Sequence, residues 1–398
     1  MKKIVIFLVF IFAFNCRLYA QEDLDENKDL KKTEGELGRL NSQLGQMKTS
    51  YDKRIDALEA KIKQVQSAGC FQSFNPDISV IGDFIFHATD KKDDEQYNQF
   101  KMRQAELAFS ATVDPYSRAD FFMHVEQEDG GWKIGLCEGY LTLLELPLDL
   151  QAKIGKFKAG FGKVNRIHLH ALPWCDYPNM LTNFFGEEGM SEPGISVSSL
   201  LANPWDQYIE LTFEALNNHN AASFAGNEGR DMAYVAHLKN FFEINPESTL
   251  ELGGSFATGP NDSGHGSNRT NLEGIDLTYK WRPLKEGLYK SLVFQNEALF
   301  SQKDQVDLNQ VDSRGAYSSL IYQFARRLSV FSRYDLSEFP DYSNRRDEAV
   351  SAGMTFAQSE YCFWRLHFKH TDRDYDKNSN EMWLQCNFGL GPHRAHTY

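Results

Sequence analysis

The sequence of 398 residues predicts an all-β transmembrane barrel of about sixteen antiparallel strands, preceded by an N-terminal α-helical coiled coil. Two observations predict the barrel. Apolar and polar residues alternate with the period of a β-strand from Cys70 to the end of the chain. Short turn-like connections such as DPYSR and INPES also alternate with longer polar ones such as GPNDSGHGSNRTN. A membrane barrel has this pattern, with its apolar side chains facing outward.

A soluble β-sandwich or propeller has the same alternation and remains an alternative. The membrane barrel is favoured because the outward positions are rich in Leu, Phe, Tyr and Val, and because 30 Phe and 17 Tyr can supply aromatic girdles at both membrane surfaces. In hydrocarbon every backbone N–H and C=O must be paired within the protein, so strands can span only as a closed sheet.

Residues 1–20 predict a secretory signal peptide. A Lys-Lys pair precedes an apolar run from Ile4 to Phe14, and the small residue Ala20 stands before an acidic stretch. The apolar run is too short for a membrane-spanning helix. Removing this segment takes away basic residues and no acids, so the mature chain is more acidic than the formal net charge of −13. That acidity argues against nucleic acid as a partner.

Residues 21–68 are predicted to form a coiled coil in the periplasm. From Leu30 to Val65 the apolar residues lie mostly three or four positions apart, with charged and amide residues between them. An amphipathic helix that faces no core is marginal in water. The helix therefore either associates with copies of itself, which we favour, or docks on the barrel.

Residues 69–398 are predicted to form the outer-membrane β-barrel. One face of QAELAFSATV at 104–113 is apolar and the other is polar, and the same alternation recurs along the rest of the segment. The predicted strands lie near 78–87, 104–113, 119–127, 135–146, 149–158, 194–201, 206–216, 231–242, 248–258, 274–282, 291–301, 315–324, 328–337, 348–357, 360–370 and 381–391.

Residues 155–192 form the longest interval in the predicted barrel without a clean strand pattern. Basic residues fill its first half and acidic residues its second half. A connection of this length within a compact fold is usually either functional or disordered. Its many aromatic and aliphatic residues, among them Phe157, Phe161, Trp174 and Phe184, argue against disorder. We therefore expect a loop that folds inward against the inside of the barrel.

Several segments carry a resemblance to a known family. NPDISVIGDF at 75–84, VDPYSRADFF at 113–122, EGYLTLLELP at 138–147 and GKFKAGFGKVN at 155–165, with the ending GPHRAHTY, are similar to the outer-membrane porins grouped with the phosphate-selective porin O and P family. The resemblance covers most of residues 75–398. It implies a sixteen-stranded trimeric channel in the outer membrane, with the third external loop folded inward.

On that resemblance we expect a porin, a passive diffusion channel for small hydrophilic solutes or ions, with an anion preference as a hypothesis. The inward loop should form the pore constriction, and the inward positions of the strands, which carry both signs of charge, should form the pore wall. The candidate constriction residues are Lys156, Lys158, Lys163, Arg166, His168, His170, Glu187 and Glu188. The candidate wall residues are Lys153, Arg333, Arg365, His367 and Lys369.

Other chemistries find less support in the sequence. His168, His170, Cys175 and Asp176 are ligand types suited to zinc or copper. They do not complete a set of four ligands at the spacing of a strong metal-binding motif, so we predict no metal and no cofactor. G-x-S-x-G and comparable signatures are absent from the sequence, and we predict no enzyme. The alternative function is an envelope tether or adhesin with a closed barrel. The predicted partners are two further copies of the chain in a homotrimer, outer-membrane lipid, and small solutes or ions.

Overall fold

The structure, a computed structural model, describes residues 76–92, 97–128, 131–217, 222–226, 232–261, 268–305 and 310–391. The predicted signal peptide and the predicted coiled coil lie outside the described residues. Within the described residues, no helix has the length and apolar character needed to cross a membrane.

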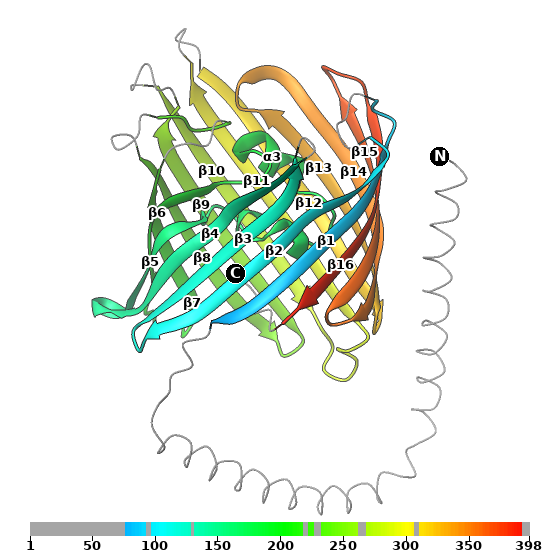
Figure 1. Cartoon of the computed structure of the whole chain (residues 1–398). Coiled ribbons are helices and arrows are strands. Elements are labelled where there is room, and N and C mark those ends of the chain that lie inside the picture. Colours follow the sequence, from blue (N-terminus) through cyan, green and yellow to red (C-terminus); the bar gives the residue numbers. More distant parts are fainter. Residues whose placement is uncertain are drawn as a thin grey trace, which may run out of the picture. The chain divides into compact units, whose positions relative to one another are not determined.

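Sixteen antiparallel strands close into a barrel, as the sequence predicts (Figure 1). Each strand pairs with the next along the chain, and β1 pairs with β16 to close the ring. The strands are β1 Asp77–Thr89, β2 Gln99–Asp114, β3 Ser117–Glu128, β4 Gly131–Leu146, β5 Leu150–Lys158, β6 Ser191–Leu200, β7 Tyr208–Leu216, β8 Ala233–Asn245, β9 Ser248–Pro260, β10 Arg269–Trp281, β11 Ser291–Asp304, β12 Gln310–Ala325, β13 Leu328–Phe339, β14 Tyr342–Ser359, β15 Cys362–Arg373 and β16 Ser379–Leu390.

The alternation of residue types decides which side of the wall each side chain faces. In β10, Leu272 is fully buried while Ile275 is 62% exposed. In β11, Leu299 is likewise buried and Phe300 is 51% exposed. Contiguous exposed apolar surface of this kind is rare on a soluble monomer and marks contact with another apolar phase. The outside of the wall therefore suits hydrocarbon, and the inside carries the polar residues together with buried apolar ones such as Leu272 and Leu299.

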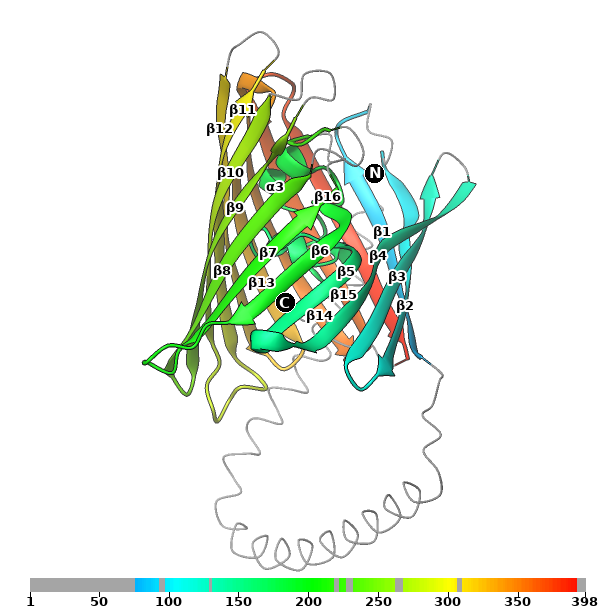
Figure 2. The ribbon, with the colours of Figure 1, turned by 90° about the vertical axis from the view of Figure 1, so that its left-hand side faces the viewer.

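The β5–β6 connection, residues 159–190, contains the 3-10 helices η2 Val164–Arg166 and η3 Leu169–Ala171 and the α-helix α3 Asn179–Phe185. A further 3-10 helix, η1 Pro147–Asp149, makes the β4–β5 turn. In both ribbon views α3 lies inside the ring of strands (Figures 1 and 2). We call residues 159–190 the inner loop.

The wall opens beside the start of the inner loop. Pairing between β4 and β5 ends at Gly139 and Lys156, so residues 131–138 of β4 pair with β3 alone. Figure 2 shows these ends of β3 and β4 leaning away from β5. Gly155 has φ of 139°, and a Cβ there would stand 2.2 Å from the carbonyl oxygen of Gly139. Glycine therefore permits the last close approach of the two strands before they diverge.

Candidate functional site

The inner loop enters the barrel through a turn that needs glycine. Gly162, in the AGFG stretch of the sequence, has φ of 61°, and a Cβ there would stand 2.3 Å from Glu297 Oε2. Its backbone N–H donates to Ser255 Oγ on β9 over 2.8 Å. The turn thus brings the backbone itself against the inner face of the wall, which a side chain at this position would prevent.

Carboxylates of the wall hold the first part of the loop by its backbone. Gly160 N donates to Glu214 Oε2 on β7, and Val164 N donates to Glu297 Oε1 on β11, both over 2.8 Å. Both hydrogen bonds have an ordinary length for an N–H donor and an oxygen acceptor. They satisfy loop backbone groups that would otherwise be unpaired inside the barrel.

An apolar core fixes the middle of the loop. Trp174 and Phe184 are fully buried, and they join a cluster with inward residues of the opposite wall, including Leu272 and Leu299. Burying side chains of this size stabilises a structure by about 1.5–3 kcal/mol each. The inner loop is therefore folded and packed inside the barrel along much of its length.

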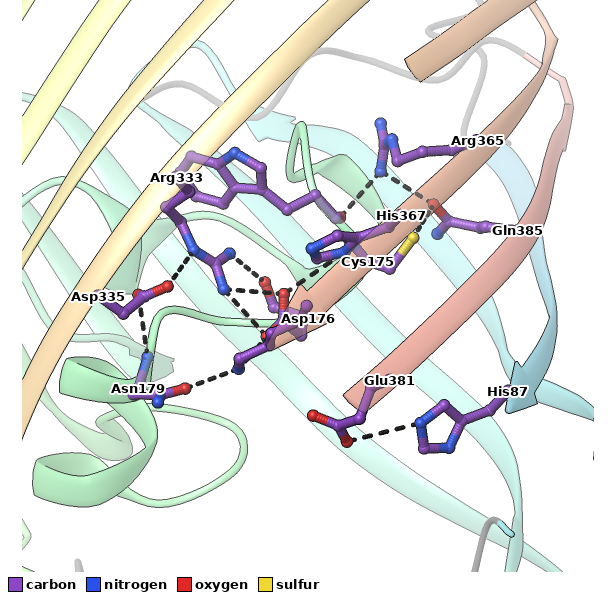
Figure 3. A network of polar contacts seen from close by, with 12 residues as sticks. His87, Cys175, Asp176, Asn179, Arg333, Asp335, Arg365, His367, Glu381 and Gln385 are labelled. Carbon is purple, nitrogen blue, oxygen red and sulfur yellow. Dashed lines mark hydrogen bonds and ion pairs between the residues drawn. The ribbon is translucent and has the colours of Figure 1, made fainter. Parts of the chain in front are cut away.

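Asp176 anchors the second part of the loop to β13 and β15 (Figure 3). Both of its carboxylate oxygens accept hydrogen bonds from Arg333 Nη2 over 3.0 Å, and Lys369 Nζ donates to its Oδ2 over 2.7 Å. Arg333 also pairs with Asp335 over 2.7 Å. Burial opposes the charge of Asp176, but Arg333 and Lys369 outweigh burial and hold the pKa of Asp176 well below its usual range.

His168 anchors the loop on the other side of the barrel. Its Nδ1 lies 2.7 Å from Glu106 Oε2 on β2, and its Nε2 lies 2.6 Å from Glu138 Oε1 on β4. Burial disfavours the imidazolium, but the hydrogen bonds and charges of the two carboxylates outweigh burial and raise the pKa of His168 to about 9. His170 is buried beside it, with Nδ1 3.5 Å from the same oxygen of Glu106.

Among the cavities that the described residues line, two polar ones lie between the inner loop and the wall. The smaller, of about 270 Å³, is lined by the ends of β4 to β7 nearest the short turns, including Lys153 and Arg166. The larger, of about 840 Å³, lies among β2, β3 and the loop, and its lining includes Glu187 and Glu188. Lys158 lines both cavities. Its Nζ donates to the hydroxyl oxygen of Tyr177 and to the backbone carbonyl of Glu188, which are both uncharged.

The remaining candidate constriction residues have different surroundings. Lys163 Nζ forms an ion pair with Glu251 Oε1 over 2.6 Å, and Lys239 Nζ lies 3.9 Å from the other oxygen of the same carboxylate. Lys156 Nζ donates to the carbonyl of Leu136 and bridges the opening between β4 and β5. Arg166 lines the smaller cavity and donates to the carbonyl of Gly160 over 3.3 Å.

The candidate wall residues all face inward, and four of them contact the inner loop. Arg333 and Lys369 bind Asp176, Arg365 Nη1 donates to the carbonyl of Trp174 over 2.9 Å, and His367 Nδ1 accepts from Cys175 N over 3.2 Å. Lys153 instead faces the smaller cavity, with its Nζ 4.7 Å from the ring centroid of Tyr140.

The structure separates the four ligand types considered for zinc or copper. His168 and His170 lie against β2 and β4, as described above. Cys175 and Asp176 lie against β13, β15 and β16, where Cys175 Sγ donates to Gln385 Oε1 over 3.5 Å. The spacing of these residues in the sequence therefore does not bring them together.

Strict alternation misses two inward residues because bulges change the parity of a strand. The β1–β2 register shifts between Asp83 and Phe84, and Arg103 turns inward to donate to Asp83 Oδ2 over 2.8 Å. The β3–β4 register shifts between Phe122 and Met123. This shift brings Cys137 to the same side as its neighbour Glu138, since a bulge places an extra residue in one strand.

Known proteins resemble the chain in fold. No protein-family model matches it. An uncharacterized protein of Aquifex aeolicus (strain VF5) is 27% identical over 419 residues, which cover 88% of this chain and 85% of that protein. An anion-selective porin from Comamonas acidovorans superposes with a TM-score of 0.55 at 9% identity, over 79% of this chain and 99% of that one. The trimer form of OmpT, an outer membrane protein of Vibrio cholerae, gives a TM-score of 0.53 at 9% identity, with the same coverage. The chain therefore has the barrel fold of outer-membrane porins.

Proposed function

We propose that the chain is an outer-membrane porin through which small hydrophilic solutes or ions diffuse passively, with a preference for anions. The observation that carries the proposal is the position of Lys158, which lines two polar cavities. The smaller cavity lies toward the short turns, and the larger lies among β2, β3 and the inner loop. A solute that crosses the barrel through these cavities passes this ammonium group. The apolar outer wall supplies the contact with outer-membrane lipid.

The anion preference rests on Lys158 rather than on overall charge. Both cavities are lined by residues of both signs, which creates a transverse field but no single-sign filter. Lys158 differs from Lys163 because its ammonium binds uncharged oxygens while that of Lys163 binds a carboxylate. The carboxylates of Glu138 and Glu188 also act on the Lys158 charge, so the proposed preference rests on the place of Lys158 in the lining of both cavities.

Permeability of reconstituted liposomes tests the channel proposal. Proteoliposomes that contain the full-length mature protein should swell in isotonic solutions of small sugars and should dissipate a chloride gradient. Liposomes prepared with the same amount of heat-denatured protein serve as the control. Tight vesicles in both assays would contradict the proposal and would favour the tether or adhesin with a closed barrel.

We further propose that the protein is a homotrimer in which the periplasmic helices of residues 21–68 associate. One neighbour in fold, OmpT, is described as a trimer. Deleting residues 21–68 should weaken the trimer without abolishing it, because barrel walls also contact one another in such assemblies. Mass measurement of both proteins in mild detergent checks this expectation, and a monomeric full-length protein would contradict it.

A further inference from the structure

Nitrogen, sulfur and oxygen ligands gather where β2, β3 and β4 face the inner loop. Glu106 on β2, Cys137 on β4 and His168 on the loop each offer one ligand atom, and these three atoms lie within 4.8 Å of one another. All three residues are buried, with 1%, 8% and 2% of their surface exposed. His124 on β3, 5% exposed, adjoins them, with its Nδ1 2.7 Å from Cys137 Sγ.

The barrel wall itself brings these side chains together. Glu106 stands directly opposite His124 in the β2–β3 ladder, so both project to the inside at the same height. The bulge in β4 adds Cys137 to the inward set beside Glu138. His168 then reaches the cluster from the inner loop. Three ligands therefore come from strands of the wall that pair with one another, and one comes from the inner loop.

Both histidines have the outer partners that metal-binding histidines usually have. Such a histidine uses one ring nitrogen for the metal and donates the other N–H to a carboxylate, which fixes the orientation of the ring. His168 presents Nδ1 toward Glu106 while its Nε2 lies 2.6 Å from Glu138 Oε1. His124 presents Nδ1 toward Cys137 while its Nε2 lies 3.2 Å from Glu126 Oε1.

A route to the cluster exists in the larger cavity. His124, Cys137 and His168 line that cavity, as do Glu126 and Glu188. The ligand atoms of His124, Glu126 and Glu188 again lie within 4.8 Å of one another, and Glu188 is exposed. A hydrated cation in the cavity thus first meets carboxylates and then the buried nitrogen and sulfur ligands.

We propose that Glu106, His124, Cys137 and His168 bind a divalent cation of the Zn²⁺ class and so fasten the inner loop to the β2–β4 wall. Zn²⁺ takes four ligands drawn from thiolate, imidazole and carboxylate, whereas Mg²⁺ and Ca²⁺ prefer oxygen ligands alone. The site goes beyond the proposed channel function, since it requires only that the barrel and the loop be folded.

Metal titration of the full-length mature protein in detergent tests the site. After treatment with a chelator and its removal, ZnCl₂ added in a calorimeter should bind with one ion per chain that MgCl₂ does not displace. The Cys137→Ser variant should bind Zn²⁺ at least about tenfold more weakly. The matched control Cys362→Ser changes a half-buried thiol on another strand, β15, and should bind as the wild type does.

Cobalt spectroscopy keeps the test decisive if a variant folds poorly. Co²⁺ added to the wild type should give a thiolate charge-transfer band in the near ultraviolet that Zn²⁺ abolishes and that Cys137→Ser lacks. A wild type that binds no Zn²⁺, or a Cys137→Ser variant with unchanged affinity and an unchanged cobalt band, would overturn the proposal. Neither readout involves transport, so a failure of the metal site is distinguishable from a failure of the channel function.

Discussion

Replacing Lys158 with glutamine should shift the selectivity of the channel towards cations. A unit charge about 7 Å from a passing ion in a water-like medium is worth about 0.6 kcal/mol, which is roughly a threefold change in the local concentration of each sign of ion. Changing Lys158, Lys163 and Arg166 together should add little beyond Lys158 and Arg166, because Lys163 is paired with Glu251. Reversal potentials in a KCl gradient measure the shift, and they should change less at high salt because of screening.

Lys156→Gln is the matched control for this prediction. The two lysines are two residues apart on β5. Lys156 Nζ binds the Leu136 carbonyl at the opening of the wall, whereas Lys158 lines both cavities. The control should therefore leave the reversal potential close to that of the wild type. Equal shifts for both variants would mean that ions respond to charge near the wall opening in general, and the anion preference could not be assigned to Lys158.

Replacing Arg333 with methionine should detach the second half of the inner loop. The side chain of Arg333 is fully buried, and its loss would leave Asp335 without the guanidinium that binds it and Asp176 with only Lys369 and the more distant His367. Removing one partner of a buried ion pair typically costs about 3–5 kcal/mol. We expect the free energy of unfolding in urea to fall by an amount of this order, and single-channel currents to become larger and noisier as the loop moves.

Arg326→Met provides the control, since Arg326 is exposed in the β12–β13 turn. It should change the free energy of unfolding by no more than about 0.5 kcal/mol, as is usual for surface substitutions. If Arg333→Met unfolded at the same urea concentration as this control and kept quiet currents, Asp176 would not be an anchor of the loop.

The sequence predicts the barrel well because the alternation of apolar and polar residues that predicts a strand lies within that strand. Alternation in 104–113 is local, and it correctly gives β2, although the strand extends from Gln99 to Asp114. The first residues of β2 were missed because the bulge at Arg103 reverses the parity of the alternation, so that Phe100 and Met102 are out of phase with Ala105 and Leu107. Closure of β1 on β16 follows from the physical demand for paired backbone groups in hydrocarbon.

The site is less accessible to sequence reasoning because its partners are far apart along the chain. The cationic run of the inner loop is visible, but Glu251, which forms an ion pair with Lys163, is 88 residues away, and Arg333 is 157 residues from Asp176. Bulges are a second reason why the sequence does not predict all of the inward-facing residues. Cys137 and Arg103 stand at positions that strict alternation assigns to the outside, and only the strand register shows that they turn inward.

Thiol accessibility at position 158 tests most directly the claim that solutes pass this residue. In a Lys158→Cys variant held in a planar bilayer, a methanethiosulfonate reagent with a bulky charged group should lower the single-channel conductance when added from either side, because residue 158 lines both cavities. The wild type and a Lys156→Cys variant, treated in the same way, control for the native thiols and for the wall opening. A Lys158→Cys conductance that the reagent leaves unchanged from both sides would contradict the account.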